Sequence, residues 1–238
     1  MLALHDVSYT FAQASAPVLH HLSFALEDKR IGIIGPNGCG KTTLFHLMVG
    51  LLQPDAGELL FHGKPVTSKE DLRALRKEVG FLFQSSDDQL FSPTVIEDVA
   101  FGPLNLGFSP QEARDIAMKT LAELSLTGFE DRITHRLSGG EKKLVALATI
   151  LAMRPKILLL DEPTNNLDPK TRSHLIDILK NLDLYQIIIS HDWDFLSHTT
   201  SILYKIDHGH IHRCEENHVH EHRHLHIAGD YPHQHDPL

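Results

Sequence analysis

The segment that most constrains the fold is a glycine-rich turn between an apolar strand pattern and a helical pattern. It reads Gly35-Pro36-Asn37-Gly38-Cys39-Gly40-Lys41-Thr42 and matches the phosphate-binding loop at every required position. In such a loop, glycines let backbone N–H groups turn inward around phosphate oxygens, and the following helix adds its positive N-terminal end. The helix is expected over residues 41–52, with Thr43 in its first turn. Residues 35–43 are therefore predicted to bind nucleotide phosphates, with Lys41 at the outer phosphates and Thr42 on Mg²⁺.

A second segment supplies the acids that such a loop needs. Leu158-Leu159-Leu160-Asp161-Glu162 is an apolar run that ends in two carboxylates, typical of a buried parallel strand. The strand would present Asp161 at its C-terminal end, where the carboxylate can hold Mg²⁺ through water. Glu162, next to it, can polarise a water that attacks the terminal phosphate. We interpret the pair as the second half of a nucleotide-hydrolysing site.

The order of the remaining patterns indicates one α/β domain. Strands are expected at residues 2–11, 22–26, 29–35, 57–62, 79–84, 157–161, 186–190 and 201–207. Helices are expected at residues 41–52, 69–77, 94–101, 110–124, 140–153 and 170–182. Alternating strands and helices predict a mostly parallel sheet with right-handed connections. The first strands alternate apolar and polar residues and predict an antiparallel portion at the N-terminus.

Between about residues 85 and 155 the strand patterns stop and helical periodicity dominates. We predict a helical lobe inserted into the α/β core there. The globular domain is expected to cover residues 1–210, and a histidine-rich tail residues 211–238. Ten of the 19 histidines lie in the last 31 residues of the chain.

A third motif opens the last helix of the predicted lobe. Leu137-Ser138-Gly139-Gly140-Glu141 combines an N-cap serine, two glycines and an acid, which makes a second anion-binding helix end. These residues resemble the signature of the ABC (ATP-binding-cassette) ATPases. The resemblance extends over about 210 residues, because the other motifs of that family occur in the expected order. It implies a P-loop NTPase core of the ABC type.

Shorter matches extend the resemblance. Gln84 matches the family's glutamine at the junction with the helical lobe, and residues 165–168 (Asn-Asn-Leu-Asp) resemble the loop after the catalytic acid. His191 resembles the family's switch histidine. Phe11 falls near the aromatic position that stacks on adenine, with Tyr9 as a neighbouring candidate.

The resemblance also implies a mechanism. ABC ATPases act as head-to-tail dimers, so Ser138, Gly139 and Gly140 are expected to contact ATP bound to the other protomer. The residues expected to act within one protomer are Lys41, Thr42, Asp161, Gln84 and His191. Glu162 is expected to be the base or the residue that orients the water. Mg²⁺ is expected on Thr42, Gln84 and Asp161. Homodimer and heterodimer both remain open, although both half-sites are intact in this chain.

The stretch after Gln84 points to a membrane partner. In ABC transporters this region receives a coupling helix, and Asp87 and Asp88 beside apolar residues suit a basic, amphipathic one. Residues 83–91, Phe-Gln-Ser-Ser-Asp-Asp-Gln-Leu-Phe, resemble the corresponding segment of energy-coupling-factor ATPases, which serve importers of vitamins and transition metals. The resemblance implies a peripheral position on the cytoplasmic face of the cell membrane, bound to integral membrane subunits.

The tail suggests a transition-metal substrate. Its alternating histidines are His218, His220, His222, His224 and His226. Imidazole is a ligand for nickel, cobalt, zinc and copper ions, and histidine-rich tracts are typical of metal binding. Nickel or cobalt import is therefore the expected function, with a zinc or vitamin importer as the alternative.

Composition weighs against other classes. The formal net charge of −9 disfavours sequence-independent nucleic-acid binding, which depends on Lys and Arg. The apolar runs are far shorter than the roughly 20 residues that cross a bilayer. A non-transport ABC ATPase of DNA repair would carry long coiled coils, and one of translation a second cassette. The sequence shows neither.

Overall fold

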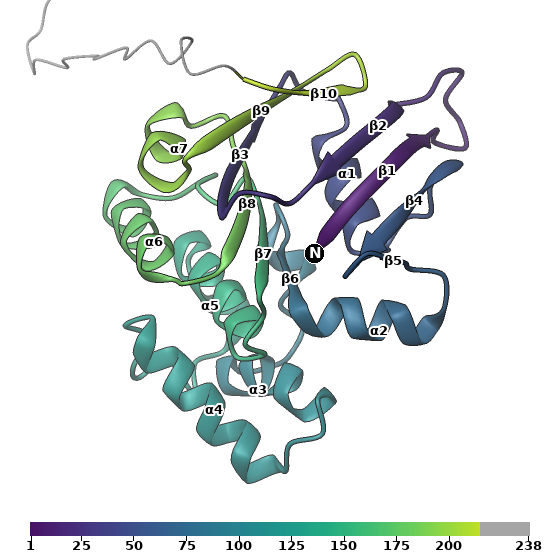
Figure 1. Ribbon diagram of the computed structural model, residues 1–238. Coiled ribbons are helices and arrows are strands. Elements are labelled where there is room, and N and C mark those ends of the chain that lie inside the picture. The colour runs from purple at the N-terminus through teal and green to yellow at the C-terminus, as the bar shows by residue number, and fades with distance from the viewer. Residues whose placement is uncertain (215–238) are drawn as a thin grey trace, which may run out of the picture.

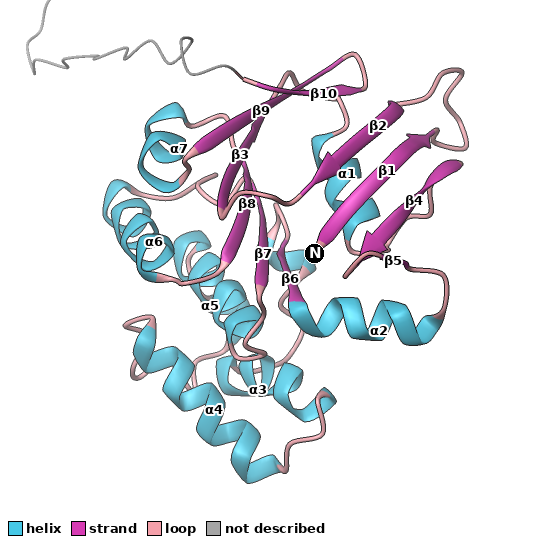
Figure 2. Ribbon diagram, in the orientation of Figure 1, coloured by secondary structure: helices cyan, strands magenta, loops and turns pink. Residues whose placement is uncertain are grey.

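The computed structural model describes residues 1–214 and is organised around two β-sheets. The larger sheet has the strand order β10-β9-β3-β8-β7-β6 (Figures 1 and 2). Its strands are β3 (Arg30–Ile34), β6 (Val79–Leu82), β7 (Ile157–Asp161), β8 (Tyr185–Ile189), β9 (Ile202–Asp207) and β10 (His210–Arg213). All neighbours pair in parallel except β9 and β10, which form an antiparallel hairpin. The predicted mostly parallel sheet is confirmed.

The smaller sheet is antiparallel and carries the N-terminus. Its order is β2-β1-β4-β5, with β1 (Leu2–Tyr9), β2 (Leu19–Ala25), β4 (Ala56–Phe61) and β5 (Lys64–Pro65). Helix α1 (Lys41–Met48) shares a core with this sheet and with one face of the larger sheet. The alternating pattern of the first strands predicts this antiparallel portion, but no pattern predicts the two-residue strand β5.

The central strand β7 shows why its residues must be apolar. All five are buried, and they alternate between two cores. Leu159 packs toward α1 and the antiparallel sheet, while Leu158 and Leu160 pack toward the helices between residues 95 and 199. Because both faces are covered, the strand is a continuous apolar run rather than an alternating one. It ends at Asp161, where the sheet meets the phosphate-binding loop.

The helical lobe lies between β6 and β7, at the bottom of Figure 1. It contains α3 (Val95–Asn105), α4 (Pro110–Glu123), α5 (Gly139–Leu151) and the short 3₁₀ turns η1 (Ser86–Asp88) and η2 (Thr134–Arg136). Serine caps start α4 and α5, and each pairs with a glutamate three residues later in a capping box. Helices α2 (Lys69–Glu78), α6 (Pro169–Asn181) and α7 (Trp193–Thr199) complete the fold.

Several boundaries differ from the predicted ones. Helix α1 ends at Met48, four residues before the predicted end, because Gly50 adopts a left-handed φ of 64° that stops the helix. Helix α3 continues to Asn105 with Pro103 inside it. Strand β10 reaches Arg213, beyond the predicted domain boundary at residue 210. None of the helices among residues 1–214 is long and apolar enough to cross a membrane.

Candidate nucleotide-binding site

The phosphate-binding loop joins β3 to α1 and is held by its own lysine. Lys41 is buried, and its Nζ donates hydrogen bonds to the carbonyl oxygens of Gly35 (2.8 Å) and Pro36 (2.9 Å). Gly40 has a left-handed φ of 101°, and a Cβ there would lie 2.7 Å from the Leu19 side chain. Only glycine fits that position, so the loop keeps the curvature that turns backbone N–H groups inward.

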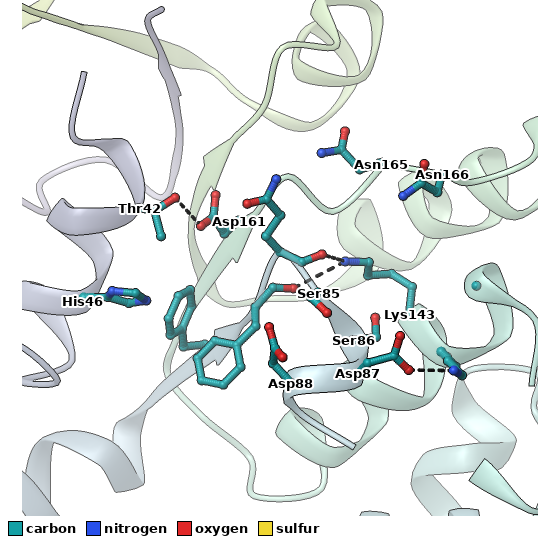
Figure 3. Close-up of a pocket in the computed structure, with 15 residues that line it drawn as sticks. Thr42, His46, Ser85, Ser86, Asp87, Asp88, Lys143, Asp161, Asn165 and Asn166 are labelled. Carbon is teal, nitrogen blue, oxygen red and sulfur yellow. Dashed lines mark hydrogen bonds and ion pairs between the residues drawn. The ribbon is translucent and has the colours of Figure 1, made fainter. Parts of the chain in front are cut away.

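Asp161 meets this loop from the end of β7. Its Oδ2 accepts a 2.7 Å hydrogen bond from the Thr42 hydroxyl, and its Oδ1 is buried without a hydrogen-bond partner (Figure 3). Burial raises the pKa of the Asp161 carboxyl, although the Thr42 hydrogen bond and nearby Lys41 oppose the change. A buried carboxylate oxygen without a partner, next to a threonine hydroxyl, is the oxygen-donor set that Mg²⁺ prefers.

Glu162 has an unusual backbone conformation and an imidazole neighbour. Its φ of 46° is left-handed, and its side chain is buried. Its Oε2 accepts a 3.3 Å hydrogen bond from the His191 backbone N–H, and its Oε1 lies 3.3 Å from His191 Nε2. Burial raises the pKa of Glu162, and His191 acts in the opposite direction. A buried carboxylate with an imidazole beside it suits the polarisation of water.

The residues expected to act in one protomer line a common cavity of about 410 Å³. They include Lys41, Asp161, Glu162 and His191, and Gln84 lies at the cavity's border with a second one. Phe11 also lines the cavity, and 47 % of it is exposed. Tyr9 packs against Phe11 edge to face, with ring centroids 5.1 Å apart, and is not among the lining residues. Phe11 is therefore the ring that faces the space beside the loop.

The signature residues lie apart from this cavity. Ser138 caps α5, its Oγ accepting from the Glu141 N–H while Glu141 Oε2 accepts from the Ser138 N–H. None of Ser138, Gly139 and Gly140 lines the 410 Å³ cavity. Gly139 lines a second, neighbouring cavity, which Thr42 and Asp161 also border. Space is open around Gly139, where a Cβ would meet nothing within 4 Å.

A second cavity of about 590 Å³ separates the core from the helical lobe (Figure 3). Lys143 of α5 forms part of its wall, is only 4 % exposed, and escaped the sequence analysis. Its Nζ donates to the carbonyl oxygens of Gln84 (2.7 Å) and Phe83 (3.3 Å). Burial lowers the pKa of Lys143, and the charges of Asp161 and Glu162 offset part of the change.

Gln89, part of the segment that resembles energy-coupling-factor ATPases, also joins the lobe to the core. Its Oε1 accepts a hydrogen bond from the Phe83 N–H, while its Nε2 donates to the Ala146 carbonyl oxygen (2.9 Å) and the Thr149 hydroxyl oxygen (3.1 Å). The Gln89 amide thus both accepts and donates hydrogen bonds. A carboxylate could not replace it, because an ionised carboxylate has no donor.

The loop that carries His191 is tied to α6 by an arginine. Arg172 donates two hydrogen bonds to Asp192, at 2.7 and 2.9 Å, and one to Asp194 at 2.6 Å. Burial alone would raise the pKa of Asp192, but the Arg172 contacts hold it below its usual value. Between these acids stands Trp193, 56 % exposed, which lines a cavity with Pro36 and His191.

The predicted partner segment forms an acidic and aromatic surface. Asp87 Oδ1 lies 2.6 Å from Lys142 Nζ, with the Asp87 side chain 75 % exposed, and Asp88 follows it in η1. Phe91 is 66 % exposed and packs edge to face on Phe101 of α3 at 4.8 Å. Asp87 and Phe91 line a cavity of about 510 Å³. We call Asp87, Asp88, Phe91 and Phe101 the acidic groove.

The tail histidines lie outside the described residues. His218, His220, His222, His224 and His226 all fall beyond Cys214, and so does most of the predicted tail. Among residues 1–214 there is no cluster of three or more His, Cys, Asp or Glu side chains that could hold a metal ion.

Comparisons with known proteins agree on one family. The family model described as "ABC transporter" matches residues 19–165. A putative ABC transporter ATP-binding protein of Nitratidesulfovibrio vulgaris is 51 % identical over 237 residues, covering 99 % of this chain and 86 % of the relative. The energy-coupling factor transporter ATP-binding protein EcfA of Methanothermobacter thermautotrophicus is 44 % identical over 89 % of this chain and 69 % of its own length.

Two solved structures have the same fold. The cbiO1 protein of Clostridium perfringens, part of the ABC transporter complex cbiONQ, superposes with a TM-score of 0.77 and 34 % identity, covering 88 % of this chain and 86 % of that one. An ATP-binding cassette solved as a dimer in a post-hydrolysis state, with ADP and Pi bound, superposes with a TM-score of 0.80 and 27 % identity. The shares covered are 90 % of this chain and 97 % of the cassette.

Proposed function

Because this chain belongs to the ABC transporter family, whose ATP-binding members are ATPases coupled to transport, we propose that it drives an energy-coupling-factor type importer of nickel or cobalt ions. The observation that carries the ATPase part is the common cavity. Lys41, the Thr42–Asp161 pair and the Glu162–His191 pair come from separate segments of the chain and line one space beside the phosphate-binding loop.

The chemistry of this cavity suits hydrolysis of ATP. Phosphoryl transfer needs positioning and charge neutralisation more than covalent participation by the protein. Lys41 and the start of α1 supply positive charge for the outer phosphates, and Glu162 orients the attacking water while His191 holds the Glu162 carboxylate in place. The unpartnered Oδ1 of Asp161 and the hydroxyl of Thr42 fit a Mg²⁺ ion, which when bound would neutralise phosphate charge, with Gln84 at the border of the site.

The separation of the signature from the loop supports a head-to-tail dimer. Ser138 and Gly139 open α5 outside the 410 Å³ cavity that holds Lys41 and Glu162, and a Cβ at Gly139 would meet nothing within 4 Å. In the proposed dimer this helix end faces ATP on the other protomer, where its N–H groups add positive potential. Since both half-sites are present in one chain, a homodimer is sufficient for two complete sites.

The acidic groove is the proposed docking site for a membrane subunit. The exposed Asp87 and Phe91 line one cavity, Asp88 follows Asp87 in η1, and Phe101 packs on Phe91. A coupling helix with basic and apolar residues is complementary to such a surface. This contact would hold the chain on the cytoplasmic face of the membrane. The solved neighbour cbiO1, described as part of a multi-protein ABC transporter complex, is consistent with such an arrangement.

We expect Asp88→Lys to reduce co-purification of this chain with its membrane subunits by about 10-fold or more, because like charges would meet at the interface. The measurement is recovery of the membrane subunits on tagged ATPase chain from detergent-solubilised membranes. Asp115→Lys, which changes an exposed acid on α4, is the matched control and should recover wild-type amounts. Equal recovery by the two variants would place the docking surface elsewhere.

The transition-metal substrate rests on sequence features. The segment Phe83–Phe91 resembles energy-coupling-factor ATPases, and the tail histidines are ligands suited to nickel, cobalt, zinc or copper ions. The EcfA relatives support the same transporter class. Zinc or a vitamin are the alternative substrates, and the tail itself is the proposed transition-metal site.

Uptake of labelled nickel, cobalt and zinc tests the substrate. Cells carrying this chain with its membrane partners are compared with cells carrying Glu162→Gln and with cells carrying a chain ended after Cys214. We expect nickel or cobalt to accumulate only with the wild-type active site, and the shortened chain to accumulate less at low metal concentration. Accumulation of zinc alone, or of no metal despite normal ATP hydrolysis, would exclude the nickel or cobalt assignment.

A further inference from the structure

Lys143 connects the signature helix α5 with the segment around Gln84, and it lies outside the signature motif itself. It lies in α5, four residues after Gly139, so the two residues share one face of the helix about one turn apart. Both line the 590 Å³ cavity, together with Thr42, Asp161 and Gln84. The first turn of the signature helix and the border of the nucleotide cavity therefore meet through this side chain.

The contacts of Lys143 are unusual for a buried cation. In the part of the chain that the structure describes, its two hydrogen-bond partners are backbone carbonyl oxygens, those of Phe83 and Gln84 (Figure 3). The carboxylates of Asp161 and Glu162 act on it only through space. Burying an ammonium group carries a desolvation penalty, and an apolar side chain of similar length would fill the same volume without that penalty. Stability alone does not account for this lysine.

The position of the two carbonyl groups that accept hydrogen bonds from Lys143 indicates a role for this side chain. They belong to the residues at the exit of β6, immediately before η1, where Gln84 borders the Mg²⁺ and phosphate region. Since Lys143 and Ser138 are on one rigid helix, a shift of that helix end moves the Gln84 backbone with it.

We propose that Lys143 is a positioning residue that ties Gln84 to the signature helix of the same protomer. In the dimer of the proposed function, on which this inference rests, engagement of Ser138–Gly140 by nucleotide on the partner would set the position of Gln84 at the chain's own site. Lys143 is thus the link through which each site depends on the other. The coupling is a two-site effect and is measured as cooperativity.

The test is steady-state ATP hydrolysis by the full chain, measured over a range of ATP concentrations at saturating Mg²⁺. We expect Lys143→Met to lower kcat about 10- to 100-fold, as displacement of a positioning contact does, with less than about a 3-fold change in KM. The apparent Hill coefficient is expected to fall from above 1 to about 1. Lys143→Arg keeps donors for both carbonyls and should recover part of kcat and of the cooperativity. Lys119→Met, at an exposed lysine of the same lobe, is the matched control.

The outcomes separate this inference from the proposed function. A folded Lys143→Met chain with wild-type kcat and Hill coefficient would overturn the inference, and so would a raised KM at unchanged kcat, which indicates direct contact with nucleotide. Non-cooperative hydrolysis by the wild type would also overturn it. Should Lys143→Met not fold, Lys143→Gln, which retains a neutral donor, is measured against the same expectations. A wild-type chain that neither binds nor hydrolyses ATP would instead remove the proposed function.

Discussion

Replacing Glu162 with glutamine is expected to reduce kcat for ATP hydrolysis by about 10²- to 10³-fold while leaving ATP binding intact. The amide has nearly the same shape, so it can keep the contact with the His191 N–H, but it cannot accept a proton from water or attract its hydrogens as a carboxylate does. With ATP no longer consumed, the closed dimer should persist. Hydrolysis measured by phosphate release, beside ATP-dependent dimer formation measured by size-exclusion chromatography, gives both quantities.

Glu123→Gln is the matched control for this variant, because Glu123 is exposed at the end of α4 and forms an ion pair with the exposed Lys119. It should hydrolyse ATP at the wild-type rate. If Glu162→Gln hydrolyses ATP within about 3-fold of wild type, the carboxylate is not the group that polarises the attacking water, and Asp161 or His191 would have to be tested in that role.

Replacing Gly139 with aspartate should abolish ATP-driven dimer formation and lower hydrolysis by about 100-fold or more, without unfolding the chain. A Cβ at this position meets nothing within 4 Å, and an acid in the first turn of a helix interacts favourably with the helix dipole. The substituted chain should therefore be as stable as wild type. In the proposed dimer, however, the new carboxylate would face the phosphates of ATP on the partner, and like charges repel.

Gly139→Ala separates charge from size, since it adds only a methyl group in the same open space. It should retain most of the dimer formation and hydrolysis, and both variants should unfold within about 2 °C of wild type. Gly139→Asp chains that dimerise with ATP as wild type does would show that this helix end does not face a partner's nucleotide.

Much of the fold could be predicted because its strongest signals are local. The apolar run into Asp161 can only be a doubly covered strand, and the glycine pattern of residues 35–42 fits only one kind of strand–loop–helix turn. Short elements without their own periodicity were missed. Strand β10 follows a two-residue turn in which His208 and Gly209 have positive φ values of 47° and 78°. The glycine at this position is the one residue in the sequence that indicates a hairpin turn here. Helix α7, seven residues long, was recognisable only by the cap residue Asp192.

The parts of the site that could not be predicted depend on which way a side chain points. Lys142 and Lys143 are adjacent in sequence and look like one solvated charged turn, but Lys143 is buried against the Gln84 carbonyl. Successive side chains of a helix point about 100° apart, so the two lysines lie on different faces of α5, and the sequence does not say which of those faces meets the core. The Arg172 fork likewise joins residues 20 apart in sequence, which no local pattern encodes.

Trp193 gives the molecule a built-in optical probe. It is the only tryptophan of the chain, so all indole emission comes from one point, two residues from His191 and beside Pro36. Its half-exposed ring stands on a helix start that Arg172 fixes from α6, so its environment changes when that loop moves or when another surface covers it. Nucleotide-driven rearrangements of this ATPase can therefore be followed in real time by fluorescence, with unlabelled protein and natural ATP.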